Sequence, residues 1–288
     1  MQYAVSNWIY GDEPLRQTFS RLAHFGYQGV ELVGEPERYE TGEVAELREE
    51  FGLEVTSVLS WCIWGIPGRD LAAPDDTERS AAERYCRACV DLASEVGAPI
   101  VVVLPAPAGR TAPTGEPQSE QAWISGYKAE WDNAVNSTRR AATYAAARDV
   151  LLALEPINRY ETFLVTNVNQ ALEFLNDVGA DNLKLHLDTF HMNIEEPDLA
   201  AAVRQAGDLL MNMHVSDSNR EAPGRGHIDF TALMQALNEV GYEGALALEP
   251  VPPGSDPLLA TKMSHNLSLR DTYAQEGISY LKRVEQSL

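Results

Sequence analysis

The chain has 288 residues, of which 44% are hydrophobic and 23% charged, a composition typical of a folded globular protein rather than a disordered one. Its 22 lysines and arginines against 43 aspartates and glutamates give a formal net charge of −21, so the average surface field repels nucleic acids and anionic membranes. The first residues, MQYAVSNWIYGDEP, show no basic region followed by an apolar run, and no stretch approaches the roughly 20 apolar residues that span a bilayer. We therefore expect a cytoplasmic protein with no nucleic-acid partner and no membrane partner.

Short apolar runs alternate with longer amphipathic stretches along the whole chain, a pattern typical of repeated β-α units around a parallel sheet. In chain order the expected strands are residues 3–7, 29–32, 55–59, 100–104, 151–155, 183–188, 210–215 and 245–249. No linker divides the chain. Eight units therefore predict one α/β domain, residues 1–288, folded as a single (β/α)₈ TIM barrel.

Helices are expected between these strands, among them residues 15–25, 77–96, 134–148, 167–178, 230–240 and 271–284. Several of them end close to a glycine, such as Gly26 or Gly179, as helix C-termini prefer. The two least regular stretches, residues 105–132 and 250–270, follow the fourth and eighth strands. They are expected on the C-terminal rim, where barrel enzymes carry their sites, as lids or substrate walls.

Four ionisable side chains end or nearly end the last four predicted strands: Glu155, Asp188, His214 and Glu249. Their intervals of 33, 26 and 35 residues suit successive β-α units, which would bring them to one mouth of the barrel. Burying an ionised group is unfavourable without a counter-charge, and a divalent cation supplies one. Three carboxylates and one imidazole favour Mn²⁺, with Co²⁺ and Mg²⁺ as alternatives, over structural Zn²⁺. For any one of these residues alone, a role in capping a strand or bonding to a loop stays open.

Other polar residues follow the predicted ligands at short offsets and would populate the rim of the barrel. They are Glu161, His191 and Arg220. Arg159 and His186 are interpreted differently, as a rim ion pair and a packing histidine, because alternate residues of a strand face away from the site.

The segments that follow these strands resemble one family of sugar enzymes. EPINRYET (155–162), LDTFHMNIEE (187–196), HVSDSNREAPGRGHIDF (214–230) and GYEGALALEP (241–250) are similar to the ketose 3-epimerases, which include the D-tagatose and D-allulose (psicose) 3-epimerases, within the xylose isomerase-like barrels. The resemblance implies Mn²⁺ or Co²⁺ bound by the four strand-end residues, and often a homodimer or homotetramer. It also implies that the O1/O2 end of a ketose is held by Glu161, His191 and Arg220.

Three regions depart from the family pattern. They are the loop SWCIWGIPGRD after the third strand, the insertion APAGRTAPTGEPQSEQAW after the fourth, and the shortened tail after Glu249. Cys62 and Trp64 lie in a region that lines the sugar pocket in the family, so we predict them as substrate contacts, with ordinary packing as the alternative. These departures leave the identity of the substrate open.

The first hypothesis for function is C3 epimerisation of a free ketose. Epimerisation removes the proton next to the C2 carbonyl and returns one from the opposite face, and Glu155 and Glu249 are predicted as the two acid/base groups. A metal chelated by O2 and O3 would polarise the carbonyl and stabilise the enediolate. The chain has no glycine-rich phosphate cradle, which favours a neutral sugar over a sugar phosphate.

The second hypothesis is a lyase or isomerase that uses the same metal site on a 3-oxo-glycoside, including C-glycoside deglycosylation by β-elimination, or on an inosose. The long loop after the fourth strand and the pair Trp61 and Trp64 would line a pocket for a larger or aryl-bearing substrate. A phosphodiesterase like the barrel-shaped abasic-site endonucleases is disfavoured by only six histidines and the charge of −21. A non-catalytic sugar-binding barrel is disfavoured because two glutamates at one metal exceed what recognition requires.

Overall fold

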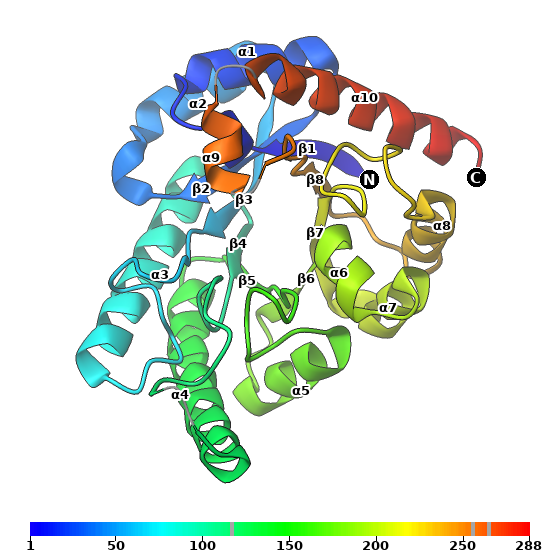
Figure 1. Cartoon of the computed structure of the whole chain (residues 1–288). Helices are drawn as coiled ribbons and strands as arrows, with labels where there is room; N and C mark the ends of the chain where they lie inside the picture. Colours follow the sequence, from blue (N-terminus) through cyan, green and yellow to red (C-terminus); the bar gives the residue numbers. More distant parts are fainter. Residues whose placement is uncertain (116–117, 255–256, 264–265) are drawn as a thin grey trace.

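The barrel seen in the computed structural model is closed by eight parallel strands, which pair in chain order from β1 to β8, with β8 beside β1. The structure describes residues 1–115, 118–254, 257–263 and 266–288. Figure 1 shows the helices as a ring around these strands. The predicted fold class, a (β/α)₈ TIM barrel, is confirmed.

The strands are β1 (Gln2–Ser6), β2 (Gly29–Gly34), β3 (Glu54–Ser60), β4 (Ile100–Val103), β5 (Leu151–Leu154), β6 (Leu183–Asp188), β7 (Leu210–Val215) and β8 (Ala245–Leu248). The α-helices are α1 (Leu15–Phe25), α2 (Thr41–Phe51), α3 (Asp76–Val96), α4 (Glu120–Ala146), α5 (Val168–Val178), α6 (Thr189–Glu195), α7 (Leu199–Ala206), α8 (Phe230–Glu239), α9 (Pro257–Lys262) and α10 (Leu267–Gln286). Short 3-10 helices are η1 (Asn7–Tyr10), η2 (Pro36–Arg38) and η3 (Gly207–Leu209).

The strands are short and apolar because a strand of a barrel is buried on both faces, by helices outside and by side chains inside. β2 and β4 are buried along their whole length. Leu59, Ile100, Val102 and Ala153, from β3, β4 and β5, form an apolar cluster inside the barrel. The larger apolar core lies between the strands and the helices.

Two register shifts interrupt the strand ladder and bear directly on the polar interior. One lies between Val30 and Glu31 where β2 pairs with β3, and the other between Leu185 and His186 where β6 pairs with β7. A bulge of this kind re-aims the side chain beside it. Both shifts therefore coincide with an ionisable residue inside the barrel.

All six predicted helices are present, but α4 begins at Glu120 and not near residue 134. Ser119 caps its first turn by accepting a hydrogen bond from the Ala122 N–H. Trp123, Tyr127 and Trp131 then stack at four-residue intervals along one side of the helix. This aromatic series extends the helix into a stretch whose prolines and glycines predict irregular chain.

The helices α2, α6 and α7 were not expected from the sequence. α2 presents only Val44 and Leu47 to the core, and α6 and α7 have seven and eight residues, too few for a clear helical period. The stretches 105–132 and 250–270 do follow β4 and β8, although α4, α9 and α10 occupy parts of them. Residues 116–117, 255–256 and 264–265 of those stretches lie outside the described residues.

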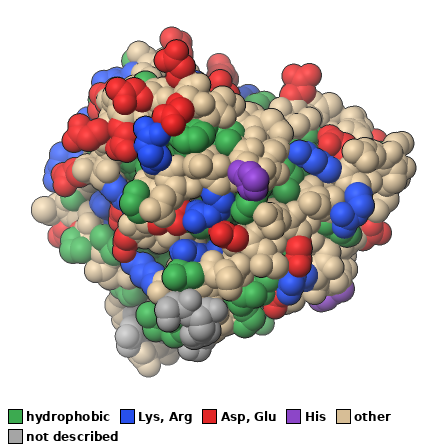
Figure 2. Space-filling view, turned by 90° about the horizontal axis from the view of Figure 1, so that it is seen from above, with side chains coloured by type: hydrophobic (Ala, Val, Ile, Leu, Met, Phe, Trp, Pro, Cys, Tyr) green, Lys and Arg blue, Asp and Glu red, His purple; other side chains and the backbone are tan. Residues whose placement is uncertain are grey.

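The outer surface mixes charges of both signs. Acidic and basic side chains are interspersed on the face shown in Figure 2, with hydrophobic ones scattered between them. α10, red in Figure 1, packs beside α1, blue, so that the last helix meets the first. Within the described part of the chain, every helix falls short of the length or the apolar character that crossing a membrane needs.

The close approach of β2 and β3 at the mouth makes a first prediction, for Gly34→Ala. A methyl group at Gly34 would lie 2.7 Å from the Leu59 carbonyl oxygen and 2.9 Å from both Ser60 Cα and the Tyr85 hydroxyl. We expect a loss of roughly 1–3 kcal/mol of unfolding free energy, typical of overpacking, measured by urea unfolding.

Gly42→Ala is the matched control, because nothing lies within 4 Å of a methyl group at that helical position. This substitution should stabilise the protein by about 0.5–1 kcal/mol. Equal stability of the two variants would contradict the packing argument.

Candidate metal centre and active site

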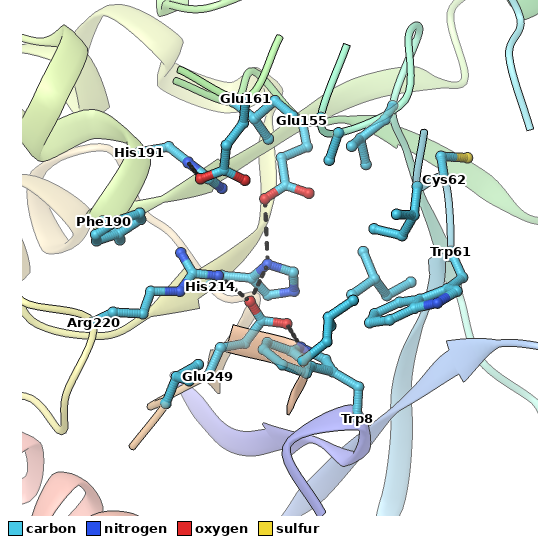
Figure 3. Close-up of a pocket in the computed structure, with 18 of the residues that line it drawn as sticks. Trp8, Trp61, Cys62, Glu155, Glu161, Phe190, His191, His214, Arg220 and Glu249 are labelled. Carbon is cyan, nitrogen blue, oxygen red and sulfur yellow. Dashed lines mark hydrogen bonds and ion pairs between the residues drawn. The ribbon is translucent and has the colours of Figure 1, made fainter. Parts of the chain in front are cut away.

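The four predicted metal ligands lie together at the carboxyl ends of their strands. Asp188 is the last residue of β6, and Glu155 and Glu249 directly follow β5 and β8. His214 Nδ1, from β7, lies 3.4 Å from Glu155 Oε1 and 3.2 Å from Glu249 Oε2. All four side chains are buried. Figure 3 shows the carboxylates of Glu155 and Glu249 approaching His214 from two sides.

The charges of this cluster shift the pKa values of its members. Burial lowers the pKa of His214, but the carboxylates of Glu249 and two neighbouring glutamates outweigh burial, so that the pKa lies well above its ordinary value. Burial raises the pKa of Glu249 to about 7, although the cations of His214 and Arg220 act in the opposite direction. For Asp188, burial is outweighed by Arg220 and the nearby histidines, and the pKa is lowered. The site thus concentrates buried negative charge, which a divalent cation would compensate.

The donor set itself fits a divalent cation. Among the described residues, three overlapping groups have their ligand atoms within 4.8 Å of one another: Glu155 with His186 and His214, Glu31 with His214 and Glu249, and Glu155 with Asp188 and His191. Carboxylate oxygens with one or two imidazole nitrogens suit Mn²⁺, Co²⁺ or Mg²⁺.

The hydrogen bonding of His214 identifies its ligand atom. His214 Nε2 lies 2.8 Å from Glu31 Oε1, so this nitrogen carries the proton and Nδ1 faces Glu155 and Glu249. Glu31 also accepts hydrogen bonds from Ser57 Oγ at 2.7 Å and Asn212 Nδ2 at 3.3 Å. Such a carboxylate partner fixes the orientation and basicity of a metal-binding histidine.

Glu31 was missed in the sequence, although it carries the same signal as the four predicted ligands. It is an ionisable residue in the apolar run GVELVG of β2 and is fully buried. Burial raises the pKa of Glu31, but the charge and hydrogen bond of His214 outweigh burial and hold that pKa below its ordinary value. Glu31 was not predicted as a site residue because it lies in the middle of its strand and not at the end.

His186 occupies the interior beside this network. Its ring lies edge-on to the His214 ring with centroids 4.0 Å apart, and its Nε2 lies 3.7 Å from Glu155 Oε1. Neither ring nitrogen has a hydrogen-bond partner among the described residues, and burial holds the pKa of His186 well below its ordinary value. A neutral, buried ring agrees with the packing role expected from the sequence.

His191 is oriented as a hydrogen-bond donor. Its Nδ1 accepts from the Asn158 backbone N–H at 3.3 Å and from Asn158 Nδ2 at 2.8 Å, which leaves the proton on Nε2, 3.5 Å from Asp188 Oδ2. Asn158 Nδ2 also donates to Glu161 Oε1 at 2.8 Å. Asn158, which sequence reasoning did not single out, therefore positions both predicted sugar-binding residues on this side.

Arg220 reaches the site from the loop after β7. Its guanidinium donates to Asp188 Oδ2 at 2.7 Å and to Glu249 Oε2 at 3.1 Å, and lies over the Phe190 ring. Its φ of 64° is in the left-handed region that non-glycine residues rarely adopt. Asp217 maintains the loop, because its carboxylate accepts the N–H groups of residues 218, 224 and 228.

A cavity of about 610 Å³, hereafter the mouth cavity, opens in front of the ligands. Its polar side contains the predicted site residues Glu155, Glu161, His191, His214, Arg220 and Glu249. Its remaining wall is mostly apolar and includes Trp8, Leu59, Trp61, Cys62, Ile63, Leu104, Ile157 and Val251. The cavity thus places a polar reaction centre against an extended apolar wall.

The two predicted substrate contacts from the third loop have different positions. Cys62 lines the mouth cavity as a buried thiol whose pKa burial raises to about 11. Trp64 is 54% exposed and is not among the residues that line this cavity. Trp61 takes that place, with its ring 5.9 Å from that of Trp8, whose Nε1–H donates to Glu249 at 2.5 Å. Arg159 forms the expected rim ion pair, with Glu195.

The sequence matches the family described as "Xylose isomerase-like TIM barrel" over residues 19–284. It is 40% identical over 123 residues to the D-psicose 3-epimerase of Ruminiclostridium cellulolyticum, a match that spans 43% of this chain and only 42% of that protein. The L-ribulose 3-epimerase of Mesorhizobium japonicum is 31% identical over 237 residues, 82% of this chain and 75% of that protein. The 3-dehydro-D-guloside 4-epimerase of Escherichia coli is 28% identical over 273 residues, 92% and 97% of the two chains.

A solved structure of a related epimerase has a similar fold. The D-allulose 3-epimerase from Methylomonas sp., crystallised with D-allulose, superimposes with a TM-score of 0.82 at 26% identity, covering 98% of this chain and 96% of that one.

The hydrogen bond from His214 to Glu31 predicts the effect of Glu31→Gln. The amide oxygen of glutamine could still accept the hydrogen bond from His214, but without the negative charge that strengthens it. The affinity for Mn²⁺ should therefore fall by roughly 10- to 100-fold while the fold persists. Isothermal titration calorimetry gives the affinity, and circular dichroism the fold. Glu54→Gln, at an exposed position of β3, is the control and should bind Mn²⁺ like the parent protein. Unchanged affinity in Glu31→Gln would remove Glu31 from the site.

The raised pKa values of His214 and Glu249 predict that cation binding releases protons. Both groups carry protons near pH 7 that compete with the metal, so affinity for Mn²⁺ should rise as the pH rises through 7. Titration calorimetry in buffers of different ionisation enthalpy counts the released protons. Affinity independent of pH between 6 and 8 would contradict this expectation.

Proposed function

The chain belongs to the xylose isomerase-like TIM barrel family, with ketose 3-epimerases among its relatives, and we propose that it is a divalent-metal-dependent ketose 3-epimerase of a free sugar. One observation carries this proposal: two buried glutamates, Glu155 and Glu249, converge on the same imidazole nitrogen from two sides. Epimerisation requires two acid/base groups on opposite faces of one carbon.

The proposed ligands of the cation are Glu155, Asp188, His214 and Glu249. When bound, the cation would supply Lewis-acid polarisation of the ketose carbonyl. Glu155 and Glu249 are proposed to exchange the C3 proton, one removing it and the other returning one from the opposite face. A pKa of about 7 suits Glu249 to this task, because an acid/base group works best when its pKa lies near the operating pH.

The O1/O2 end of the ketose is proposed to lie against Glu161, His191 and Arg220. The Nε2–H of His191 and the guanidinium of Arg220 are donors for sugar oxygens, and the Glu161 carboxylate is an acceptor. Trp8 and Trp61 shield the opposite side of the reaction centre from water.

Three finer properties are part of the proposal. Mn²⁺ is favoured as the native cation by the oxygen-rich ligand set. A homodimer or homotetramer is supported by the exposed apolar side chains of Trp123 and Ile124 near the start of α4, which projects beyond the ring of helices in Figure 1. A cytoplasmic location for a single domain of residues 1–288 agrees with three cysteines that are all free and buried.

A second candidate function is favoured by the size and lining of the mouth cavity. Its volume of about 610 Å³ and its apolar wall exceed the needs of a small polar sugar. The relative from Escherichia coli is named for a 3-dehydro-glycoside, and it aligns along almost the whole chain. The same acid/base pair would serve a lyase or isomerase of a 3-oxo-glycoside, including C-glycoside deglycosylation by β-elimination, or of an inosose.

Proton exchange at C3 tests the proposal. Protein loaded with Mn²⁺ should incorporate deuterium from D₂O at C3 of D-fructose, D-tagatose, D-allulose or L-ribulose and form the C3 epimer, both followed by NMR. Absence of exchange with every free ketose, in protein shown to hold the metal, would exclude the epimerase. Elimination or epimerisation of a 3-oxo-glycoside by the same sample would then support the second candidate.

Glu249→Gln sharpens this test, because glutamine keeps the shape of the side chain and removes the base. We expect turnover to fall by about 10²- to 10⁴-fold, the usual contribution of an acid/base group, with the fold intact and the bound metal measured. Glu239→Gln, on the surface of α8, should match the parent protein. Full turnover in Glu249→Gln would exclude this residue from the catalytic pair.

A further inference from the structure

Three rim loops pair with one another beyond the ends of β3, β4 and β5. The Ala108 N–H donates to the Cys62 carbonyl at 2.9 Å, and the Trp64 N–H donates to the Ala108 carbonyl at 2.8 Å. The Gly109 N–H donates to the Glu161 carbonyl at 2.7 Å. Residues 62–64, 108–110 and 161–162 therefore form a small parallel extension of the barrel, here called the rim sheet.

One side of the rim sheet is a wall of the mouth cavity, which Cys62, Ile63, Ala108, Gly109 and Glu161 all line. In Figure 3, Cys62 lies across the cavity from Arg220. A ketose whose O1/O2 end is held by Glu161, His191 and Arg220 would therefore extend its other end towards residues 62–63 and 108.

The other side of the rim sheet is held by one buried cation, Arg110, which is 4% exposed. Its Nη2 lies 2.6 Å from Glu130 Oε2 of α4 and 3.3 Å from Asp70 Oδ2 of the loop after β3. Its Nη1 donates to Thr114 Oγ1 at 2.8 Å, and the Thr114 N–H donates to Glu130 at 2.6 Å. Both carboxylates are also buried.

The aromatic contacts of Arg110 complete its links to the three loops. Its guanidinium carbon lies 4.7 Å from the centre of the Phe163 ring, on the loop after β5, and 5.4 Å from that of Trp64, on the loop after β3. Arg110 therefore contacts every loop of the rim sheet and α4. A planar guanidinium can satisfy several partners in fixed directions, which a lysine ammonium cannot do.

We propose that Arg110 is a specificity-determining positioning residue, which fixes the rim sheet as a rigid wall and so sets how long a substrate the site accepts. It touches neither the cavity nor the reacting atoms and acts through residues 62–63 and 108–109. This inference rests on the proposed function, because that function assigns which end of the ketose meets the wall. A wall held by buried ion pairs does not adjust to sugars of different length. It therefore discriminates between a sugar with a shorter carbon chain and one with a longer carbon chain.

Arg110→Lys tests the proposal with a ketohexose and the ketopentose of the same configuration at C3 and C4. The ratio of their kcat/KM values should change by about tenfold, because one carbon unit in a packed pocket is worth roughly 10- to 200-fold. A merely structural loss of active protein would lower both values equally and leave the ratio unchanged. Arg140→Lys, which alters the exposed Arg140 of α4 in its ion pair with the largely covered Glu83, is the matched control and should keep the ratio.

Amide hydrogen exchange supplies a readout that does not depend on the substrate. The amides of Trp64, Ala108 and Gly109 should exchange about tenfold faster or more in Arg110→Lys than in Arg140→Lys. If Arg110→Lys does not fold, Glu130→Gln, which keeps an acceptor for Thr114, replaces it with the same expectations.

Unchanged exchange at these amides, or an unchanged kcat/KM ratio, would overturn the role of Arg110. Failure of the parent protein to exchange C3 of any ketose would instead refute the proposed function and, with it, the assignment of substrate length. The exchange of the three amides would still decide whether Arg110 fixes the rim sheet.

Discussion

The structure of the mouth depends on one constraint, the burial of four carboxylates in a small volume of low dielectric. Glu31, Glu155, Asp188 and Glu249 are each less than about one-twentieth exposed and face one imidazolium and one guanidinium. Four carboxylates beside only two cationic groups are stable only with further compensation, and the raised pKa of Glu249 reflects burial and this crowding. Hydrogen bonds from Ser57, Asn212 and Trp8 to these carboxylates relieve part of the imbalance, and a divalent cation would relieve the rest.

The fold, and the meeting of the four strand-end side chains at one mouth of the barrel, could be predicted from the sequence because both depend on local patterns. Each of Glu155, Asp188 and Glu249 interrupts an apolar run at its end, and parallel strands end at the same mouth. Glu31 was not predicted because it lies inside its strand and next to a register shift. The periodicity of a single strand cannot show such a shift. The choice between Trp61 and Trp64 depends on how the loop after β3 pairs with residue 108, which is equally invisible along the chain.

The rim sheet could not be predicted from the sequence, because the interactions that hold it join residues that are distant along the chain. Arg110 meets Glu130 and Asp70 through ion pairs that link two loops to a helix. In the sequence, the same arginine is one charged residue in a stretch rich in proline and glycine, with no periodic pattern around it. The polar side of the cavity thus follows from patterns along single strands, whereas the opposite wall depends on contacts between segments that are distant in sequence.

The loop after β7 has a consequence for altering this protein by directed evolution. A methyl group at Gly226 would lie 2.2 Å from Asp217 Oδ1, so almost any substitution there displaces the carboxylate that organises the loop. Arg220 depends on the same turn for its left-handed backbone. Mutant libraries intended to broaden substrate range should therefore keep residues 217–228 constant and diversify Ile63 and Leu104, whose side chains face the cavity from the other side.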